Sequence, residues 1–221
     1  MWSEVWAILG KDLRMEWRQR HAIGSVFLYV AAAVFVAYLG FRQMADIASW
    51  NALFWIIVLF SAFNAAARSF STEVAGRRLY LYTLARPEAV IIAKFIYNAF
   101  VLLVMVLASF IVYTLTLGSF ALEEAHLPTL CAVWILGSIG LSAVLTLVSA
   151  LAAQSDQNIG LMAILGLPVI LPFLLLLMRF SKNALDGIAW SVNSTYAWQL
   201  LSVSLLSLAL SYILFPYLWR E

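Results

Sequence analysis

Few side chains in this sequence could carry out chemistry. Cys131 is the only cysteine, and His21 and His126 are the only histidines. Cys131 has no histidine near it in the sequence to act as a base, and two widely separated histidines make a poor metal-binding set. No GxxxxGK[ST] phosphate loop occurs, so the usual motif for binding and hydrolysing ATP is missing. We therefore expect no catalytic residue, no metal site and no cofactor bound directly to this chain.

The most informative polar segment is a charged loop at 68–94. It is too apolar for a solvated linker and too charged for the bilayer, which favours short helices. Gly76 can break the helix between Glu73 and Leu79, because glycine lacks the Cβ that restricts the backbone. Pro87 suits the first turn of the next helix. Ordinary loop structure and a docking surface for a soluble partner both remain open. The docking residues would be Glu73, Gly76, Arg77, Arg78, Leu79, Leu84 and Pro87.

Six long apolar runs surround this loop and must position it. Hydrophobic residues make up 65% of the chain and charged residues 11%, against about 25% charged in an ordinary soluble domain. Each run has about the 20 residues needed to cross ~30 Å of hydrocarbon. The runs lie near 22–41, 50–67, 93–118, 128–153, 158–178 and 198–217, and none contains Asp or Glu. They lack the alternation of barrel strands, so we predict an all-α, six-span membrane protein with a single transmembrane domain over 1–221.

The positive-inside rule orients this bundle. Lys and Arg number ten on the side of the termini and the 68–94 loop, against three on the other side: Arg42, Arg179 and Lys182. We therefore expect both termini and the charged loop to be cytoplasmic.

The first 21 residues read as an amphipathic helix in the membrane interface. Apolar residues recur every three or four positions, and basic residues occupy another face. The residues that we assign to this interfacial helix are Lys11, Arg14, Trp17 and Arg18. A simple membrane anchor and an elbow helix that also touches a cytosolic partner both remain open.

Four further features concern packing, movement and the membrane surface. Pro168 and Pro172 each remove a backbone hydrogen bond in the fifth span, which predicts either a static kink or a moving hinge. Small residues in the fourth span permit close packing, either within the bundle or against a second copy. Most tryptophans, among them Trp50 and Trp55, lie near span ends and suggest an aromatic belt. The segment 179–197 is too apolar for an ordinary external loop, so we expect an external loop or a partly re-entrant helix there.

Four motifs carry a family resemblance. They are KDLRMEWR at 11–18, EVAGRRL at 73–79, LARPEAVIIAK at 84–94 and LMAILGLPVILPF at 161–173. In length, span count and motif order the chain resembles the CcmB family, heme exporter protein B, the ABC-transporter permease of bacterial cytochrome c maturation.

The resemblance implies a complex in the bacterial inner membrane. Two permease copies would form a homodimer and dock onto a separate ATPase, CcmA, through the loop between helices two and three, which maps onto Glu73 through Leu84. CcmC, which presents heme, and the small CcmD would join them, and ATP hydrolysis would be linked to release of the heme chaperone CcmE. ATP and heme would therefore sit on partner subunits, and no nucleic acid is involved. A general ABC exporter for another substrate, and a non-transporting scaffold of the maturation complex, remain as alternatives.

Overall fold

The computed structural model describes residues 1–18, 20–40, 46–71, 86–152 and 159–218. All regular structure in these ranges is helical, which confirms the predicted all-α fold. The helices are α1 (Trp2–Arg18), α2 (Arg20–Gly40), α3 (Ile47–Ser71), α5 (Pro87–Leu117), the short 3-10 helix η1 (Phe120–Leu122), α6 (Leu127–Ala152), α7 (Ile159–Leu185) and α8 (Trp190–Leu218).

Five helices in the described part of the chain are long and apolar enough to cross a membrane. They are α3, α5, α6, α7 and α8, and their apolar stretches are between 20 and 31 residues long. In α2 the described apolar stretch is Leu28–Gly40, which is shorter than a full span. The described part of the predicted span, 22–40, is therefore helical, but its crossing of the membrane stays a prediction.

Helix α6 forms the centre of the bundle and packs against α3, α5, α7 and α8. Its small residues are buried between these neighbours: Gly137, Ser138, Gly140, Ser142 and Ala143. A Cβ added to Gly140 would lie 2.1 Å from Cζ of Phe173, and one added to Gly137 would lie 3.0 Å from Cδ1 of Leu177. Of the two packing alternatives, the small residues thus serve contacts within one chain.

An aromatic cluster fills the space between α3 and α5. Trp50 and Trp55 are 1% and 0% exposed, and Trp50 packs edge-to-face on Tyr113 with ring centroids 4.8 Å apart. The Tyr113 hydroxyl donates a hydrogen bond to the Trp50 carbonyl oxygen at 2.8 Å. The aromatic-belt interpretation is therefore wrong for these two tryptophans, because they point to the buried side of α3. Trp190 and Trp198 are exposed, as a belt requires.

The end of the bundle that contains the α7–α8 connection also differs from expectation. Helix α7 continues to Leu185 and α8 begins at Trp190, so most of the segment 179–197 is helical and not a long loop, while its re-entry into the membrane stays a prediction. Only residues 186–189 connect the two helices. Gly187 makes this turn with φ of 69°, and a Cβ there would lie 2.6 Å from the Glu124 carbonyl oxygen. The turn is therefore closed tightly onto the segment that precedes α6.

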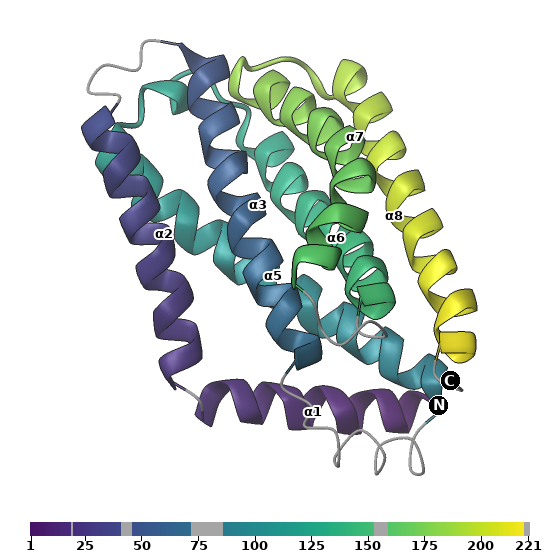
Figure 1. Cartoon of the computed structure of the whole chain (residues 1–221). Helices are drawn as coiled ribbons and strands as arrows, with labels where there is room; N and C mark the ends of the chain where they lie inside the picture. Colours follow the sequence, from purple (N-terminus) through teal and green to yellow (C-terminus); the bar gives the residue numbers. More distant parts are fainter. Residues whose placement is uncertain (19, 41–45, 72–85, 153–158, 219–221) are drawn as a thin grey trace.

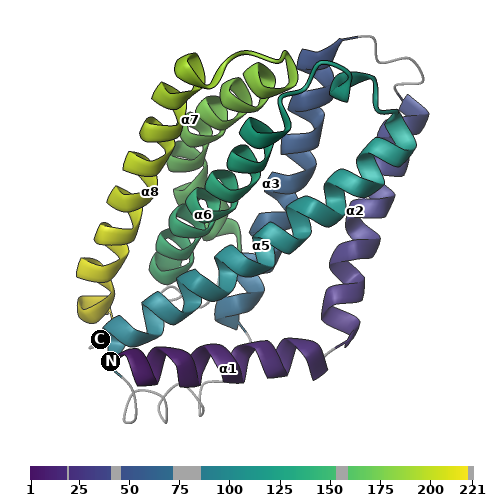
Figure 2. The same ribbon diagram turned by 180° about the vertical axis from the view of Figure 1, so that it is seen from behind.

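At the other end of the bundle, α1 lies across the ends of the other helices (Figure 1). The start of α1 and the end of α8 come close together there, as the view from behind also shows (Figure 2). Helix α5 runs from this corner up through the bundle, so its first turns rest on α1.

Candidate functional site

The junction between α1 and the first turns of α5 is the candidate functional site, because α5 begins at Pro87, inside the charged loop predicted at 68–94 and shortly after the predicted docking residues Glu73 to Leu84. One face of α1, including Val5 and Ile8, packs on Ala89, Val90 and Ala93 of α5. Phe215 of α8 and Ala150 of α6 complete this small apolar cluster. Burying an aliphatic side chain contributes about 1.5–3 kcal/mol, so α1 is held firmly against α5.

The start of α5 follows the sequence prediction. Pro87 occupies the first helical turn, and Glu88 is in the same turn. Arg86, the residue before proline, has an extended backbone with φ −72° and ψ 139°, as the steric clash with the proline ring requires. The predicted helix start at Pro87 is confirmed.

Glu4 of α1 ties this helix start to the beginning of the chain. The backbone N–H of Arg86 donates to Oε2 of Glu4 at 3.1 Å, and the terminal ammonium of Met1 lies 3.1 Å from Oε1. The Arg86 N–H, followed by the terminal ammonium, lowers the pKa of the Glu4 carboxyl below its ordinary value. Glu4 near the start of α1 therefore binds the backbone of Arg86, the residue directly before α5.

A buried ion pair makes a further connection between the two helices. Nζ of Lys94 lies 3.1 Å from Oδ2 of Asp12, and the two side chains are 4% and 8% exposed. Nζ of Lys11 lies 3.1 Å from Oδ1 of the same carboxylate, with its side chain 36% exposed. Buried charges are tolerated in proteins when they are paired. One carboxylate of α1 thus joins an ammonium of its own helix to an ammonium of α5.

Sequence reasoning missed this pair. Lys94 was counted only as a positive charge beside a span, and Asp12 was read only as part of the 11–18 motif. The signal that could have drawn attention to it is a single acidic residue on the apolar side of an amphipathic helix: Asp12 follows Val5, Ile8 and Leu9 at helical spacing.

The other residues of the predicted site lie in several places. Glu73, Gly76, Arg77, Arg78, Leu79 and Leu84 are outside the described residues. Lys11 is half-buried and Arg14 is exposed on α1, and Trp17 and Arg18 form the end of that helix.

The two prolines of the fifth span are inside α7, which runs as one helix from Ile159 to Leu185. Pro168 and Pro172 are both exposed on the surface of the bundle. A hinge at these residues stays a prediction.

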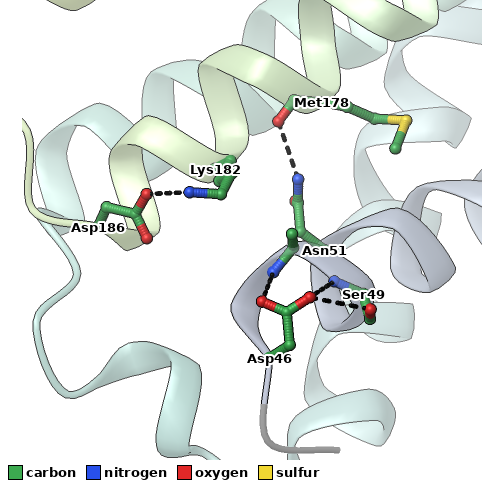
Figure 3. Close-up of polar contacts among 7 residues, drawn as sticks. Asp46, Ser49, Asn51, Met178, Lys182 and Asp186 are labelled. Carbon is green, nitrogen blue, oxygen red and sulfur yellow. Dashed lines mark hydrogen bonds and ion pairs between the residues drawn. The ribbon is translucent and has the colours of Figure 1, made fainter.

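A second polar cluster lies at the opposite end of the bundle (Figure 3). Asp46 caps α3 by accepting hydrogen bonds from the backbone N–H groups of Ala48 and Ser49, and these bonds lower the pKa of its carboxyl. Lys182 pairs with Asp186 at the end of α7. The side-chain amide of Asn51 donates to the Met178 carbonyl oxygen at 2.8 Å, which fixes α3 to α7.

In the parts of the chain that the structure describes, the side chains that could act in catalysis or bind a metal ion do not form a common site. No three His, Cys, Asp or Glu side chains there form a group that could hold a metal ion. Nδ1 of His126 lies 2.7 Å from Oγ1 of Thr129, and Cys131 is exposed on α6.

The fold defines a multi-pass helical membrane protein. Its buried ion pair, Asp12 with Lys94, connects two helices and does not form part of a catalytic group. The sequence model of the CcmB protein family matches residues 3–217, nearly the whole chain. The chain belongs to the CcmB family. It is therefore a membrane component of a heme exporter system of cytochrome c biogenesis, in which other Ccm proteins take part. A search of curated proteins found no match.

Proposed function

We propose that this chain is the permease subunit of an ABC transporter complex in the bacterial inner membrane. A separate CcmA-like ATPase hydrolyses ATP, and the permease passes the resulting motion to heme export or to release of the heme-loaded chaperone. Family membership and the five apolar helices support the membrane role. The lack of a phosphate-loop motif in the sequence supports the division of labour.

The observation that carries the proposal is the attachment of α1 to the start of α5. The ATPase would press on the segment Glu73 to Leu84. Three contact types then connect the next helix to α1: the Glu4–Arg86 hydrogen bond, the apolar cluster and the Asp12–Lys94 pair. Because of these contacts, movement of the segment Glu73 to Leu84 shifts α5 and α1 together.

The surface of α1 supports an interfacial position for this helix. Trp2 and Trp6 are 62% and 67% exposed, although α1 packs closely on α5 through its other face. Exposed indoles are favoured at the headgroup level of a membrane, where the ring and its N–H meet different surroundings. With α1 on the cytoplasmic surface, both termini face the cytoplasm.

Membership of the CcmB family supports our proposal for the rest of the assembly. Two copies of the chain pair within the complex, CcmC-like and CcmD-like subunits join it, and a CcmE-like chaperone receives heme. Pro168 and Pro172 allow α7 to bend when α5 is displaced, since neither proline donates a backbone hydrogen bond.

Copurification tests the proposal. The tagged chain, expressed with its genomic neighbours, should recover an ATPase, whereas the isolated chain should hydrolyse no ATP. Glu73→Arg and Gly76→Pro should abolish formation of holocytochrome c while the chain still inserts into the membrane. Gly40→Ala is the matched glycine control, because a Cβ there meets no atom within 4 Å. Wild-type holocytochrome levels in both loop variants contradict the coupling role.

A further inference from the structure

Two buried hydrogen bonds join α5 to α6 close to the α1–α5 junction. The side-chain amide of Asn98 donates to Oγ1 of Thr146 at 3.2 Å. The hydroxyl of Ser142 donates to the Phe95 carbonyl oxygen at 2.8 Å. Asn98 is 3% exposed, and the two α6 side chains are 0% exposed. Phe95 directly follows Lys94, whose side chain pairs with α1, so the two bonds come next to the buried ion pair along α5.

The hydroxyl of Ser142 bonds differently from those of other buried serines. A serine inside a helix commonly donates to the carbonyl oxygen four residues earlier in its own helix. Four other buried serines follow this pattern at 2.6–2.8 Å: Ser61, Ser138, Ser204 and Ser211. Ser142 instead donates to a different helix, and the Phe95 carbonyl oxygen can accept this bond because it has two lone pairs. Ser142 therefore serves the contact between α5 and α6.

The membrane setting makes these two bonds specific connections. Both α5 and α6 are long and apolar enough to cross a membrane, and hydrocarbon offers no hydrogen-bonding partner to a polar side chain. Sliding α5 along α6 would break both bonds and leave a buried amide and a buried hydroxyl without their partners, which is unfavourable. The bonds therefore fix the register between the two helices over one turn of each.

Helix α6 is in turn closely packed on α7. A Cβ at Gly140 of α6 would lie 2.1 Å from Cζ of Phe173 in α7. One turn earlier, a Cβ at Gly137 would lie 3.0 Å from Cδ1 of Leu177, also in α7. Helices that approach so closely cannot shift independently, because a packed interior leaves few voids to move into. A displacement of α6 therefore reaches the proline-containing helix α7.

We propose that Asn98 and Ser142 are positioning residues that pass a displacement of α5 to α6. This inference rests on the proposed coupling role, in which the partner ATPase displaces α5 and α1 together. The pair of Asp12 and Lys94 makes α1 move with α5, and the two hydrogen bonds make α6 move with α5. Motion at the surface helix then reaches the centre of the bundle.

The first experiment compares two substitutions at Thr146. Thr146→Val keeps the size of the side chain but removes the acceptor of the Asn98 amide, whereas Thr146→Ser keeps the hydroxyl. Holocytochrome c is measured in cells, and ATPase activity in the complex purified from them. Thr146→Val should lower the holocytochrome c formed per ATP hydrolysed by roughly three- to fifteenfold, the range that corresponds to one interhelical hydrogen bond in a membrane. Thr146→Ser should keep most of the coupling, and equal losses in both variants overturn the proposal.

Tyr113→Phe is the control for a purely structural effect. It removes a hydrogen bond of 2.8 Å that joins the other end of α5 to the Trp50 carbonyl oxygen of α3. It should lower Tm by a few degrees, as Thr146→Val does, but leave the holocytochrome c formed per ATP unchanged. Ser142→Ala should uncouple like Thr146→Val. Equal uncoupling by Tyr113→Phe, or full coupling in both α6 variants, refutes the positioning role.

A double-variant cycle on the purified chain tests the contact without any partner. Thr146→Val should have a smaller effect on Tm in a chain that already carries Asn98→Leu, because the shared bond is then already lost. Additive losses of Tm show that the two side chains do not interact, and they refute this inference alone. Failure of the wild-type chain to recover an ATPase refutes the proposed function, and this inference with it, so the two failures are distinguishable.

Discussion

Neutralising Asp12 should loosen the junction between α1 and α5 more than any other single change of charge there. Asp12→Asn keeps the shape of the side chain but removes the charge that faces Lys94 at 3.1 Å. At an effective dielectric constant of about 20 the Coulomb attraction over this distance is ~5 kcal/mol. Removing one partner of a buried pair costs about 3–5 kcal/mol. This loss is large beside the total stability of a typical domain, about 5–15 kcal/mol.

The change should be visible as a lower melting temperature. For a chain of about 150–250 residues, 1 kcal/mol corresponds to roughly 2–4 °C, so Asp12→Asn should lower Tm by roughly 6–20 °C. Intrinsic tryptophan fluorescence of the purified chain in detergent follows this transition. Lys11→Gln is the matched control, because it removes the other cation of the same carboxylate at a side chain that is 36% exposed. Exposed pairs contribute about 0–1 kcal/mol, so this control should shift Tm by only a few degrees.

Exchanging the two charges separates the interaction between Asp12 and Lys94 from the effect of each substitution alone. Asp12→Lys and Lys94→Asp should each abolish holocytochrome c formation, and the double variant should recover at least part of both Tm and activity. A Tm loss below about 2 °C in Asp12→Asn, or a double variant no better than its parents, refutes the reasoning that this pair holds the two helices together.

Three smaller perturbations test other contacts. Gly140→Ala should destabilise the bundle by about 1–3 kcal/mol, because the new methyl group would lie 2.1 Å from Cζ of Phe173. Gly10→Ala should be neutral or slightly stabilising. Thermal unfolding compares the two variants. Asp46→Ala should lower Tm through loss of the α3 cap, and Asp46→Asn should retain most of the cap. The contact of Glu4 with the Arg86 N–H should be fully formed above the ordinary pKa of 4.5 and lost as pH falls through the lowered folded-state pKa; hydrogen exchange of the Arg86 amide measures it.

Each of these has its own contradicting result. Equal Tm values for Gly140→Ala and Gly10→Ala would show that α6 and α7 can separate without cost. A full loss of stability in Asp46→Asn would show that the carboxylate charge, rather than its hydrogen bonds, caps α3. Protection of the Arg86 amide, relative to the intrinsic exchange rate at each pH, that does not change with pH, or that changes equally in Glu4→Gln, removes Glu4 as its partner.

The sequence predicts the main helices well because lipid imposes a simple rule. Every backbone group must bond within a helix, so runs without Asp or Glu, such as 128–153, coincide with real helices such as Leu127–Ala152. Helix ends are harder to predict. Lys182 and Asp186 looked like loop charges, but four residues apart they pair along the last turn of α7, so the helix continues past the apolar run.

The contacts between helices could not be predicted from the sequence. Trp50 and Trp55 lie close to the end of an apolar run, and only the packing of α3 on α5 shows that they face inward. Nothing in the pattern indicates that Asp12 meets Lys94, because that pairing depends on how α1 crosses the bundle. The predicted docking residues from Glu73 to Leu84 remain untested, while the one described member, Pro87, lies where the sequence placed it.

The pairing of Asp12 with Lys94 also has a consequence for biosynthesis. Residue 94 leaves the ribosome 82 residues after residue 12, which at about 5–20 residues per second is a delay of roughly 4–16 s. During that interval Val5, Ile8 and the Asp12 carboxylate of α1 lack their contacts with α5. The helix α1 must wait at the surface of the bilayer until α5 is inserted, so α1 is made before α5 but reaches its final place only after it.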